Sequence, residues 1–349
     1  MIWDVVVIGA GQAGLAAGYW LRRAGMSFVM LDRGSEPGET WLARYESLRL
    51  FTPRTHSALP GMEMQGNPDG FPDKYEVAAY LKSYASRFEL PIQWKQEVLS
   101  VTKERDGFVI HTEGEELRAK KLIIATGPFQ RPRIPAFSAA LPKDILQLHS
   151  SAYMEPSQLQ GGNVLVVGGG NSGAQIATEL SGSRETYLSL GQRPRILPMT
   201  MGGKSMFWWL DRLGILSART DSWIGRALRR KGDPIFGYEL KQAVKCGKVV
   251  LKKRAVRAGS SGMELDDGTI VSVRNVIWAT GFVSRYDWLR IEGAMDHEQA
   301  VIHANGHSPI SGLYYVGLPW QTHRGSALLT GVGRDARAIV QAIINEEGD

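Results

Sequence analysis

One local pattern occurs twice in this chain of 349 residues, and it constrains the fold more than any other feature. Each copy has a short β-branched run, three glycines spaced Gly-x-Gly-x-x-Gly, a helical segment and a second apolar run. The turns are Gly9–Gly14, after residues 4–8, and Gly168–Gly173, after residues 163–167. Such short apolar runs are typical of strands buried on both faces of a parallel sheet. The repeat therefore predicts two βαβ units, each with a dinucleotide-binding turn.

The three glycines of each turn have separate physical roles. The first permits a tight turn, the second lets backbone N–H groups approach a pyrophosphate, and the third lets the helix pack closely on the strand. The N-terminus of the following helix adds about half a positive charge beside the phosphates. Since strand, turn, helix and second strand are all present, we expect a dinucleotide at both turns.

The two units differ where the second strand ends. Asp32 follows the first glycine of its turn by 23 residues, and the same count in the second unit reaches Gly191. A carboxylate here accepts hydrogen bonds from ribose hydroxyls, whereas arginine accommodates a 2′-phosphate. The first site therefore suits FAD or NAD, and the second, followed by Arg193 and Arg195, tolerates or prefers NADPH. The alternative is that these two arginines are merely exposed basic residues.

Two dinucleotide sites in one chain indicate a hydride that passes from a nicotinamide to a tightly held flavin. Residues 121–127 and 275–281 each read as a strand that ends in Ala-Thr-Gly, and they bracket the second unit. The predicted fold class is therefore α/β, with two Rossmann-like domains, the second inserted into the first. We expect residues 1–156 and 282–349 to form the FAD-binding domain and residues 157–281 the NAD(P)H-binding domain.

The end of the chain completes the first domain. Residues 312–318 read as a strand, and a helix is expected from about Gly333 to Asn345. Because this helix would begin after Gly331-Val332-Gly333, its positive end could face the flavin's pyrimidine ring.

Composition excludes several classes. Cys246 is the only cysteine, so disulfides, CxxC redox pairs and cysteine metal clusters cannot form within the chain. The seven histidines are scattered, and we expect no metal site. The net charge of +6 comes from dispersed basic residues, and the clusters at 229–231 and 252–254 read as solvated faces, so no nucleic-acid partner is expected. The charges around the apolar run 5–21 have the wrong polarity for a signal peptide, and no membrane span is expected. These features predict a cytoplasmic protein.

With both glycine turns and both Ala-Thr-Gly crossings in place, the sequence resembles the class B flavin-dependent monooxygenases, and most closely a compact bacterial branch. This family includes the flavin-containing, Baeyer–Villiger and plant indole-3-pyruvate monooxygenases. The resemblance covers nearly the whole chain and extends to Pro37-Gly38-Glu39-Thr40-Trp41, Tyr45, Leu48 and Thr52-Pro53-Arg54. In the family this region lies along the flavin, although Trp41 alone would read as a core residue.

The chain departs from the family at its identifying motif, FxGxxxH followed four residues later by an aromatic residue. His149 and Tyr153 are present, but Lys143 and Ile145 stand where the family has Phe and Gly. The departure puts efficient oxygenation in question. We expect His149 to act as a residue that links the domains and orients the cofactor, or simply as a hydrogen-bonded linker histidine.

The resemblance and the motifs together give a set of expected site residues. The FAD contacts are Gly9, Gly11, Gln12, Ala13, Gly14, Asp32, Arg33, Thr40, Trp41, Thr52, Val98, Thr126, Gly127, Leu318 and Leu329. The NAD(P)H contacts are Gly168, Gly170, Asn171, Ser172, Gly173, Gln192, Arg193, Lys204, Thr280 and Gly281. The expected cofactors are FAD and NADPH, with NADH as a second possible donor.

The resemblance implies that NAD(P)H reduces FAD and that a C4a-hydroperoxyflavin oxygenates a small organic substrate, by sulfoxidation, amine oxidation or Baeyer–Villiger insertion beside a ketone. Molecular oxygen is then the second partner, and a homodimer is one expected arrangement. Two alternatives keep every binding motif: an NAD(P)H-dependent flavin reductase or oxidase, and a non-catalytic redox-sensing flavoprotein linked to cation transport. The aromatic residues of segment 205–232 read as core, with a substrate pocket or a subunit contact as alternatives.

Overall fold

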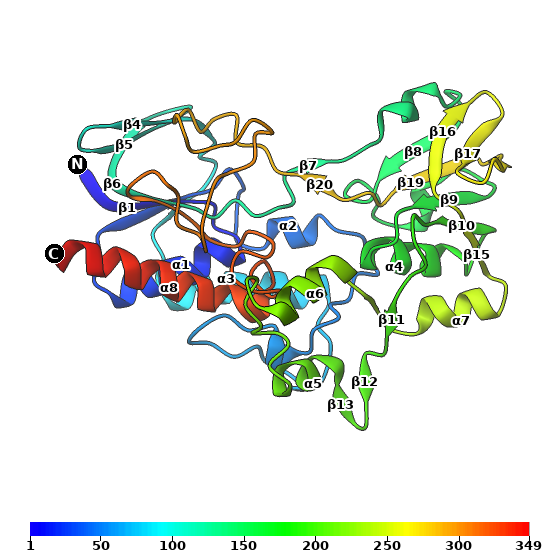
Figure 1. The fold of residues 1–349 in the computed structure, drawn as a ribbon, viewed down its shortest axis with the longest axis horizontal. Helices are drawn as coiled ribbons and strands as arrows, with labels where there is room; N and C mark the ends of the chain where they lie inside the picture. Colours follow the sequence, from blue (N-terminus) through cyan, green and yellow to red (C-terminus); the bar gives the residue numbers. More distant parts are fainter. Residues whose placement is uncertain (349) are drawn as a thin grey trace.

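Two sheets, each built around one of the glycine turns, form the two lobes of the computed structural model, which describes residues 1–348 (Figure 1). The first sheet has the order β3-β2-β1-β6-β5-β4, and β21 pairs with the C-terminal end of β6. The strands β3, β2, β1, β6 and β21 are parallel, and β4 and β5 extend the sheet as an antiparallel meander. Their bounds are β1 Ile2–Ile8, β2 Phe28–Leu31, β3 Ile92–Gln93, β4 Val98–Glu104, β5 Gly107–Thr112, β6 Glu116–Ile124 and β21 Leu313–Tyr315.

The second sheet is entirely parallel, with the order β15-β10-β9-β19-β8. Its strands are β8 Leu146–His149, β9 Val164–Val167, β10 Thr186–Ser189, β15 Val249–Lys252 and β19 Asn275–Trp278. The helices α4 (Asn171–Leu180) and α7 (Glu239–Lys245) cover one face, and the antiparallel strands β16 (Ala255–Gly259), β17 (Gly262–Leu265) and β18 (Ile270–Val271) cover the other. Both faces are therefore buried, as a parallel sheet requires.

The chain enters and leaves the second lobe through adjacent segments. β7 (Arg131–Pro132) and β20 (Phe282–Val283) pair antiparallel between the lobes (Figure 1). The predicted fold class, with the second Rossmann-like unit inserted into the first, is thereby confirmed. The predicted boundary at residue 156 is too late, however, because β8 already pairs with β19 in the second sheet. Four residues of an edge strand carry too little periodicity to be assigned from sequence.

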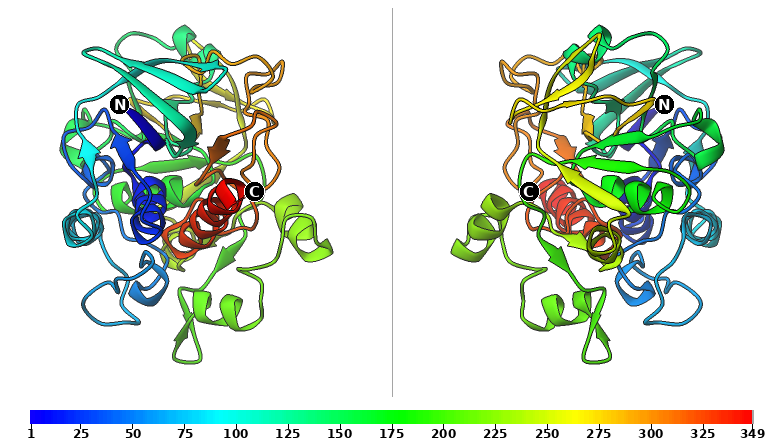
Figure 2. Two further views of the ribbon diagram at one scale, coloured as in Figure 1. Left: turned by 90° about the vertical axis from the view of Figure 1, so that its left-hand side faces the viewer. Right: turned by 90° about the vertical axis from the view of Figure 1, so that its right-hand side faces the viewer.

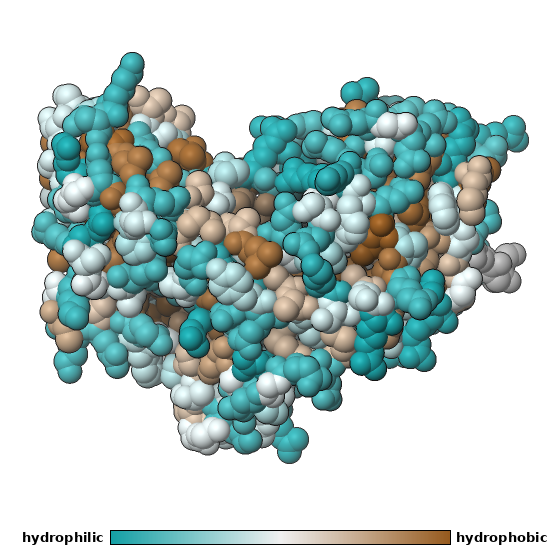
Figure 3. Space-filling view, turned by 180° about the vertical axis from the view of Figure 1, so that it is seen from behind, coloured by the Kyte–Doolittle hydropathy of each residue, from teal (hydrophilic) through white to brown (hydrophobic). Residues whose placement is uncertain are grey.

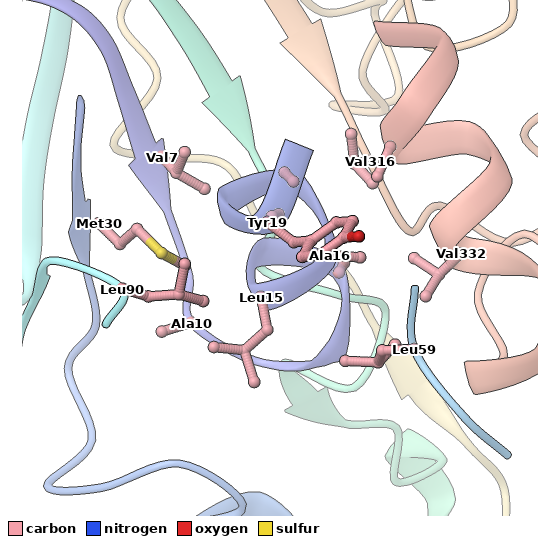
Figure 4. Close-up of a cluster of buried hydrophobic side chains, with 14 of the residues drawn as sticks. Val7, Ala10, Leu15, Ala16, Tyr19, Met30, Leu59, Leu90, Val316 and Val332 are labelled. Atoms are coloured by element: carbon pink, nitrogen blue, oxygen red, sulfur yellow. The ribbon is translucent and has the colours of Figure 1, made fainter. Parts of the chain in front are cut away.

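The first core forms between the first sheet, α1 (Gln12–Arg23), α3 (Lys74–Arg87) and α8 (Leu329–Gly348). Figure 4 shows side chains of α1 lying between Val7 and Met30 of the sheet on one side and Val332 of α8 on the other. This close packing is possible only with glycine at position 14, because a Cβ there would lie 1.8 Å from the carbonyl oxygen of Gly9. The third glycine of the turn is thus required by packing.

We predict that Gly14→Ala lowers the free energy of unfolding by about 3 kcal/mol, since a Cβ there must displace backbone. Urea unfolding measures this loss. The control is Gly114→Ala, where a Cβ meets no atom within 4 Å. Equal stability of the two variants would contradict the packing role of Gly14.

The last helix begins earlier than the sequence predicts. α8 starts at Leu329, so Gly331 and Gly333 lie in its first two turns rather than before it. A Cβ at Gly331 would lie 2.5 Å from the carbonyl oxygen of Gly325, and one at Gly333 would lie 2.4 Å from Cγ of Pro60. These two glycines let neighbouring loops pack closely against the helix. From the sequence alone, glycines with this role look the same as glycines that precede a helix.

Segment 196–236 leaves the second sheet and returns to it. It holds α5 (Met206–Arg212), α6 (Trp223–Lys231) and the short strands β11 Ile196–Leu197, β12 Thr200–Met201, β13 Lys204–Ser205 and β14 Ile235–Phe236. Phe207 is buried and stacks with Phe51 of the first lobe, as its core interpretation predicts. Trp223 is 75% exposed on α6, which stands out from the body in Figure 2. Core packing therefore does not explain Trp223.

The remaining helices are short: α2 Glu39–Leu42 and the 3₁₀ turns Arg54–His56, Ala136–Ala140 and Pro156–Gln158. No helix within residues 1–348 is long and apolar enough to cross a membrane. Seen from behind, the surface is mostly hydrophilic with small hydrophobic patches, and a hollow separates the two lobes at its upper edge (Figure 3).

Candidate functional site

The first glycine turn joins the carboxyl end of β1 to α1 and carries its acidic partner beside it. Gly9 has a φ of +101°, and its N–H donates to the carbonyl of Leu31 over 2.8 Å. The Asp32 carboxylate accepts hydrogen bonds from the N–H of Ala10 (2.6 Å) and of Gly34 (2.8 Å). Asp32 is therefore held at the turn, with acceptor capacity left for a ribose.

Both helix N-termini are shaped for a phosphate. Gly11 and Gly170 are the N-cap residues of α1 and α4, and neither end has a side-chain cap. The first N–H groups of each helix thus keep their donors for another acceptor. A Cβ at Gly11 or at Gly170 would meet no atom within 4 Å. These open cradles fit the diphosphates of FAD and of a nicotinamide dinucleotide.

The structure brings most of the expected FAD residues around the first turn. A Cβ at Gly9 would lie 3.1 Å from the backbone nitrogen of Thr126, and one at Gly317 would lie 2.6 Å from Cβ of Ala13. The Gln12 amide donates to the carbonyl of Ala327, shortly before α8. Arg33, Gly127 and Leu318 lie near the turn as the chain neighbours of Asp32, Thr126 and Gly317. The FAD contacts of Thr40 in α2, Val98 at the start of β4 and Leu329 at the start of α8 stay predictions.

Two expected FAD residues have packing roles in the structure. Trp41 of α2 is half-buried and packs against the first core, so its core interpretation stands beside the flavin one. Thr52 is buried, and its hydroxyl shares a 2.7 Å hydrogen bond with Ser57.

The second glycine turn opens onto a cavity of about 530 Å³ at the carboxyl ends of the second sheet. Gly168 and Thr280 line it, together with Ser189 and Gly191 from the end of β10. A volume of this size suits a nucleotide. Gly173 packs against the turn as Gly14 does, since its Cβ would lie 2.1 Å from the carbonyl oxygen of Gly168.

Sequence reasoning missed two arginines of this cavity. Arg133, which follows β7, and Arg254, which follows β15, both line it. A Cβ at Gly191 would lie 3.8 Å from Cδ of Arg254, so Arg254 stands where the first unit carries its acid. Residues 252–254 read as a solvated face because they lack interleaved aromatic residues, and Arg254 is exposed in the structure. The sequence does not show that β15 pairs with β10, which brings Arg254 to the cavity.

Other predicted NAD(P)H residues lie further out or have other partners. Gln192 and Arg193 are exposed beyond the end of β10, and Arg195 donates to the carbonyls of Lys231 and Gly232. Lys204 is exposed in the β12–β13 hairpin, which Figure 1 shows apart from α4, and it does not line the cavity; its contact with NAD(P)H stays a prediction.

The first residue of α4 also forms hydrogen bonds with the segment around β14. The Asn171 side chain accepts from the N–H of Phe236 (2.9 Å) and donates to the carbonyl of Pro234 (3.2 Å). Asn171 and Ser172 therefore offer a phosphate their backbone N–H groups, while the amide of Asn171 fixes β14 in place.

His149 connects the second sheet to the second crossing. Its Nε2 donates to the carbonyl of Gly281 over 2.9 Å, and its Nδ1 lies 2.8 Å from the Ser151 hydroxyl. Burial lowers the pKa of His149, so it is neutral at neutral pH. Tyr153 is buried in the second-lobe core and donates to Glu179. These contacts make His149 a linker between segments rather than an exposed base.

Burial is also the main cause of a lowered pKa at His56, His303 and His323, relative to the ordinary value of 6.5. The unfolded chain then binds protons more readily below about pH 6.5, so stability rises with pH in this range. We predict that the free energy of unfolding falls as the pH drops from about 7.5 to about 5.5. His149→Asn should reduce this fall, whereas substitution of the exposed His297 serves as the control. A fall as large in His149→Asn as in the wild type would contradict the role of burial.

Comparisons with known proteins show the family to which the chain is similar. A family model described as pyridine nucleotide-disulphide oxidoreductase matches residues 6–189. An uncharacterized oxidoreductase CzcO of Bacillus velezensis is 51% identical over 97% of this chain and 99% of its own.

Solved structures extend the similarity to the whole fold. A flavin-containing monooxygenase from Stenotrophomonas maltophilia is 30% identical over 99% of both chains, with a TM-score of 0.84. A protein named OTEMO, solved in complex with FAD and NADP, matches over 99% of this chain and 86% of its own at 17% identity and a TM-score of 0.71. The second likeness bears on the fold alone.

Proposed function

This chain belongs to the pyridine nucleotide-disulphide oxidoreductase family and is a member of the class B flavin-dependent monooxygenases. We propose that it is an NAD(P)H-dependent flavin monooxygenase that acts on a small organic substrate. The proposal rests on two glycine turns that each lead into a helix without a side-chain cap, and on the different residues that stand beside the ends of the strands that follow, β2 and β10. Asp32 stands beside one turn and Arg254 beside the other. Two unlike dinucleotides can thus be held in one chain.

The first turn would hold FAD and the second NADPH. Asp32 would accept hydrogen bonds from the adenosine ribose of FAD, and it would repel a 2′-phosphate. Arg254 and Arg133 line the cavity beside Gly191, where a cation favours the 2′-phosphate of NADPH.

The chain's own residues position the cofactors and exclude water. When bound, the flavin supplies the transfer of electrons from nicotinamide to molecular oxygen. His149 holds the second crossing through Gly281, which fixes the spacing between the two turns. The partly buried Phe51 stacks on the buried rings of Phe207 and Phe236, and this contact would help to keep water out of the junction between the lobes.

A second candidate function is an NAD(P)H-dependent flavin reductase or oxidase that releases peroxide. The observation that favours it is the altered motif, with Lys143 and Ile145 in place of Phe and Gly. Every dinucleotide-binding feature is common to both functions, so only the fate of oxygen separates them.

The proposal is tested first by reduction without oxygen. The purified protein should show flavin absorbance, and anaerobic NADPH should bleach it with one equivalent per flavin. A protein that cannot be loaded with FAD, or whose flavin is not bleached by NADPH or NADH, would contradict both candidate functions.

We predict that Arg254→Ala lowers kcat/KM for NADPH about tenfold to a hundredfold, the range for loss of a charge-assisted contact, and leaves NADH within about twofold. Steady-state reduction of the flavin with each donor measures this. Arg257→Ala is the matched control, because Arg257 is exposed and pairs with Glu264. A selective loss in Arg193→Ala with none in Arg254→Ala would assign the 2′-phosphate to Arg193 instead.

A further inference from the structure

Arg44 is a half-buried cation at the junction of the two lobes. Its guanidinium lies 5.1 Å from the ring centre of Phe129 and 5.0 Å from that of Phe282. The two rings contact each other edge to face at 5.2 Å. Phe129 follows the first Ala-Thr-Gly crossing and Phe282 follows the second, so Arg44 touches both connections between the lobes.

This cation has aromatic neighbours. Among residues 1–346, whose side chains the structure describes, Arg44 forms no ion pair with a carboxylate, and the influences on it are burial and the neighbouring Tyr45. A guanidinium stacked on rings uses its faces and keeps its N–H edge for a planar or tetrahedral oxyanion. Since an unpaired buried charge is costly, its retention here indicates an anionic partner.

The segment that follows Arg44 packs along α4. The Tyr45 hydroxyl donates to Oε1 of Gln175 over 2.8 Å, and the Gln175 amide donates to the carbonyl of Arg49 over 3.0 Å. The crossing on which Phe282 stands also borders the second turn, since a Cβ at Gly168 would lie 2.2 Å from the carbonyl oxygen of Ala279. The residue after Arg44 therefore contacts α4, and the ring of Phe282 that Arg44 touches stands on the crossing that borders the second turn, where the N-terminus of α4 has no side-chain cap.

We propose that Arg44 reaches from the first lobe to bind the diphosphate of the nicotinamide dinucleotide held on the second turn. The inference rests on the proposed function, because it needs that dinucleotide. The diphosphate carries the oxyanions that the guanidinium edge and the N–H groups of α4 both attract. The cofactor thereby bridges the lobes, with its adenosine end beside Arg254 and its diphosphate beside Arg44.

The experiment compares two nucleotides by titration calorimetry on the FAD-loaded protein. NADP⁺ contains the diphosphate, whereas 2′-AMP carries the 2′-phosphate alone. Arg44→Ala should weaken NADP⁺ binding about tenfold to a hundredfold and leave 2′-AMP within about twofold. Arg44→Lys, which keeps the charge without the fork, should lie between. Arg131→Ala is the control, an exposed arginine of β7 near Asp287.

The outcomes separate this inference from the proposed function. Unchanged NADP⁺ affinity in Arg44→Ala, or an equal loss for NADP⁺ and 2′-AMP, overturns the role of Arg44 while the nicotinamide site stands. Wild-type protein that binds neither nucleotide overturns the nicotinamide site and this inference together.

Discussion

Replacing Gly11 by alanine should give a folded protein that has lost its flavin. Gly11 has φ −72° and ψ −171°, which alanine adopts without strain, and a Cβ there meets no atom within 4 Å. The methyl group instead enters the space where the diphosphate approaches the N-terminus of α1. Overpacking of about 1–3 kcal/mol corresponds to FAD binding weakened about tenfold to a hundredfold.

Flavin content after purification and FAD titration of the apoprotein measure this effect, and thermal unfolding of the apoprotein measures the fold. The informative comparison is with Gly14→Ala, whose Cβ would strike backbone and which should lose stability even without flavin. If Gly11→Ala kept wild-type affinity for FAD, the first turn would not be the diphosphate site.

The matching substitution in the second turn, Gly170→Ala, should separate the two cofactors. Gly170 has φ −85°, and its Cβ also meets no atom within 4 Å. The variant should keep a full complement of FAD while kcat/KM for flavin reduction falls about tenfold to a hundredfold with NADPH and with NADH. Both donors are affected because both carry the diphosphate.

Gly170→Ala therefore differs from Arg254→Ala, which should affect NADPH alone. Anaerobic stopped-flow reduction with each donor distinguishes the two patterns. Loss of FAD from Gly170→Ala, or unchanged reduction by both donors, would contradict the assignment of the second turn to the nicotinamide.

Residues that act through local geometry were predictable from the sequence. The glycine turns, Asp32 and the two Ala-Thr-Gly crossings depend on spacing along one segment, and the structure has them as strand ends and helix starts. The insertion of the second unit followed from the repeated crossing motif alone.

Features that depend on which strands become neighbours were not predictable. Arg254 reaches the cavity because β15 pairs with β10, and Lys204 misses it because its hairpin leaves the sheet. The predicted start of α8 is too late because Gly331 and Gly333 read as a loop, whereas in the helix they let Gly325 and Pro60 pack closely against it. Arg44 lies in no recognisable motif, and its proposed role follows only from its contacts with Phe129 and Phe282, which stand on the two connections between the lobes.

In a monooxygenase, electrons from NADPH reduce molecular oxygen, and one of its two oxygen atoms enters the organic product while the other leaves as water. The most direct test measures NADPH consumed, peroxide released and oxygenated product formed across a panel of sulfides, amines and ketones. We expect, for at least one substrate, close to one product per NADPH with little peroxide. Stoichiometric peroxide and no product with every substrate would contradict the proposed function and assign the protein to the reductases and oxidases.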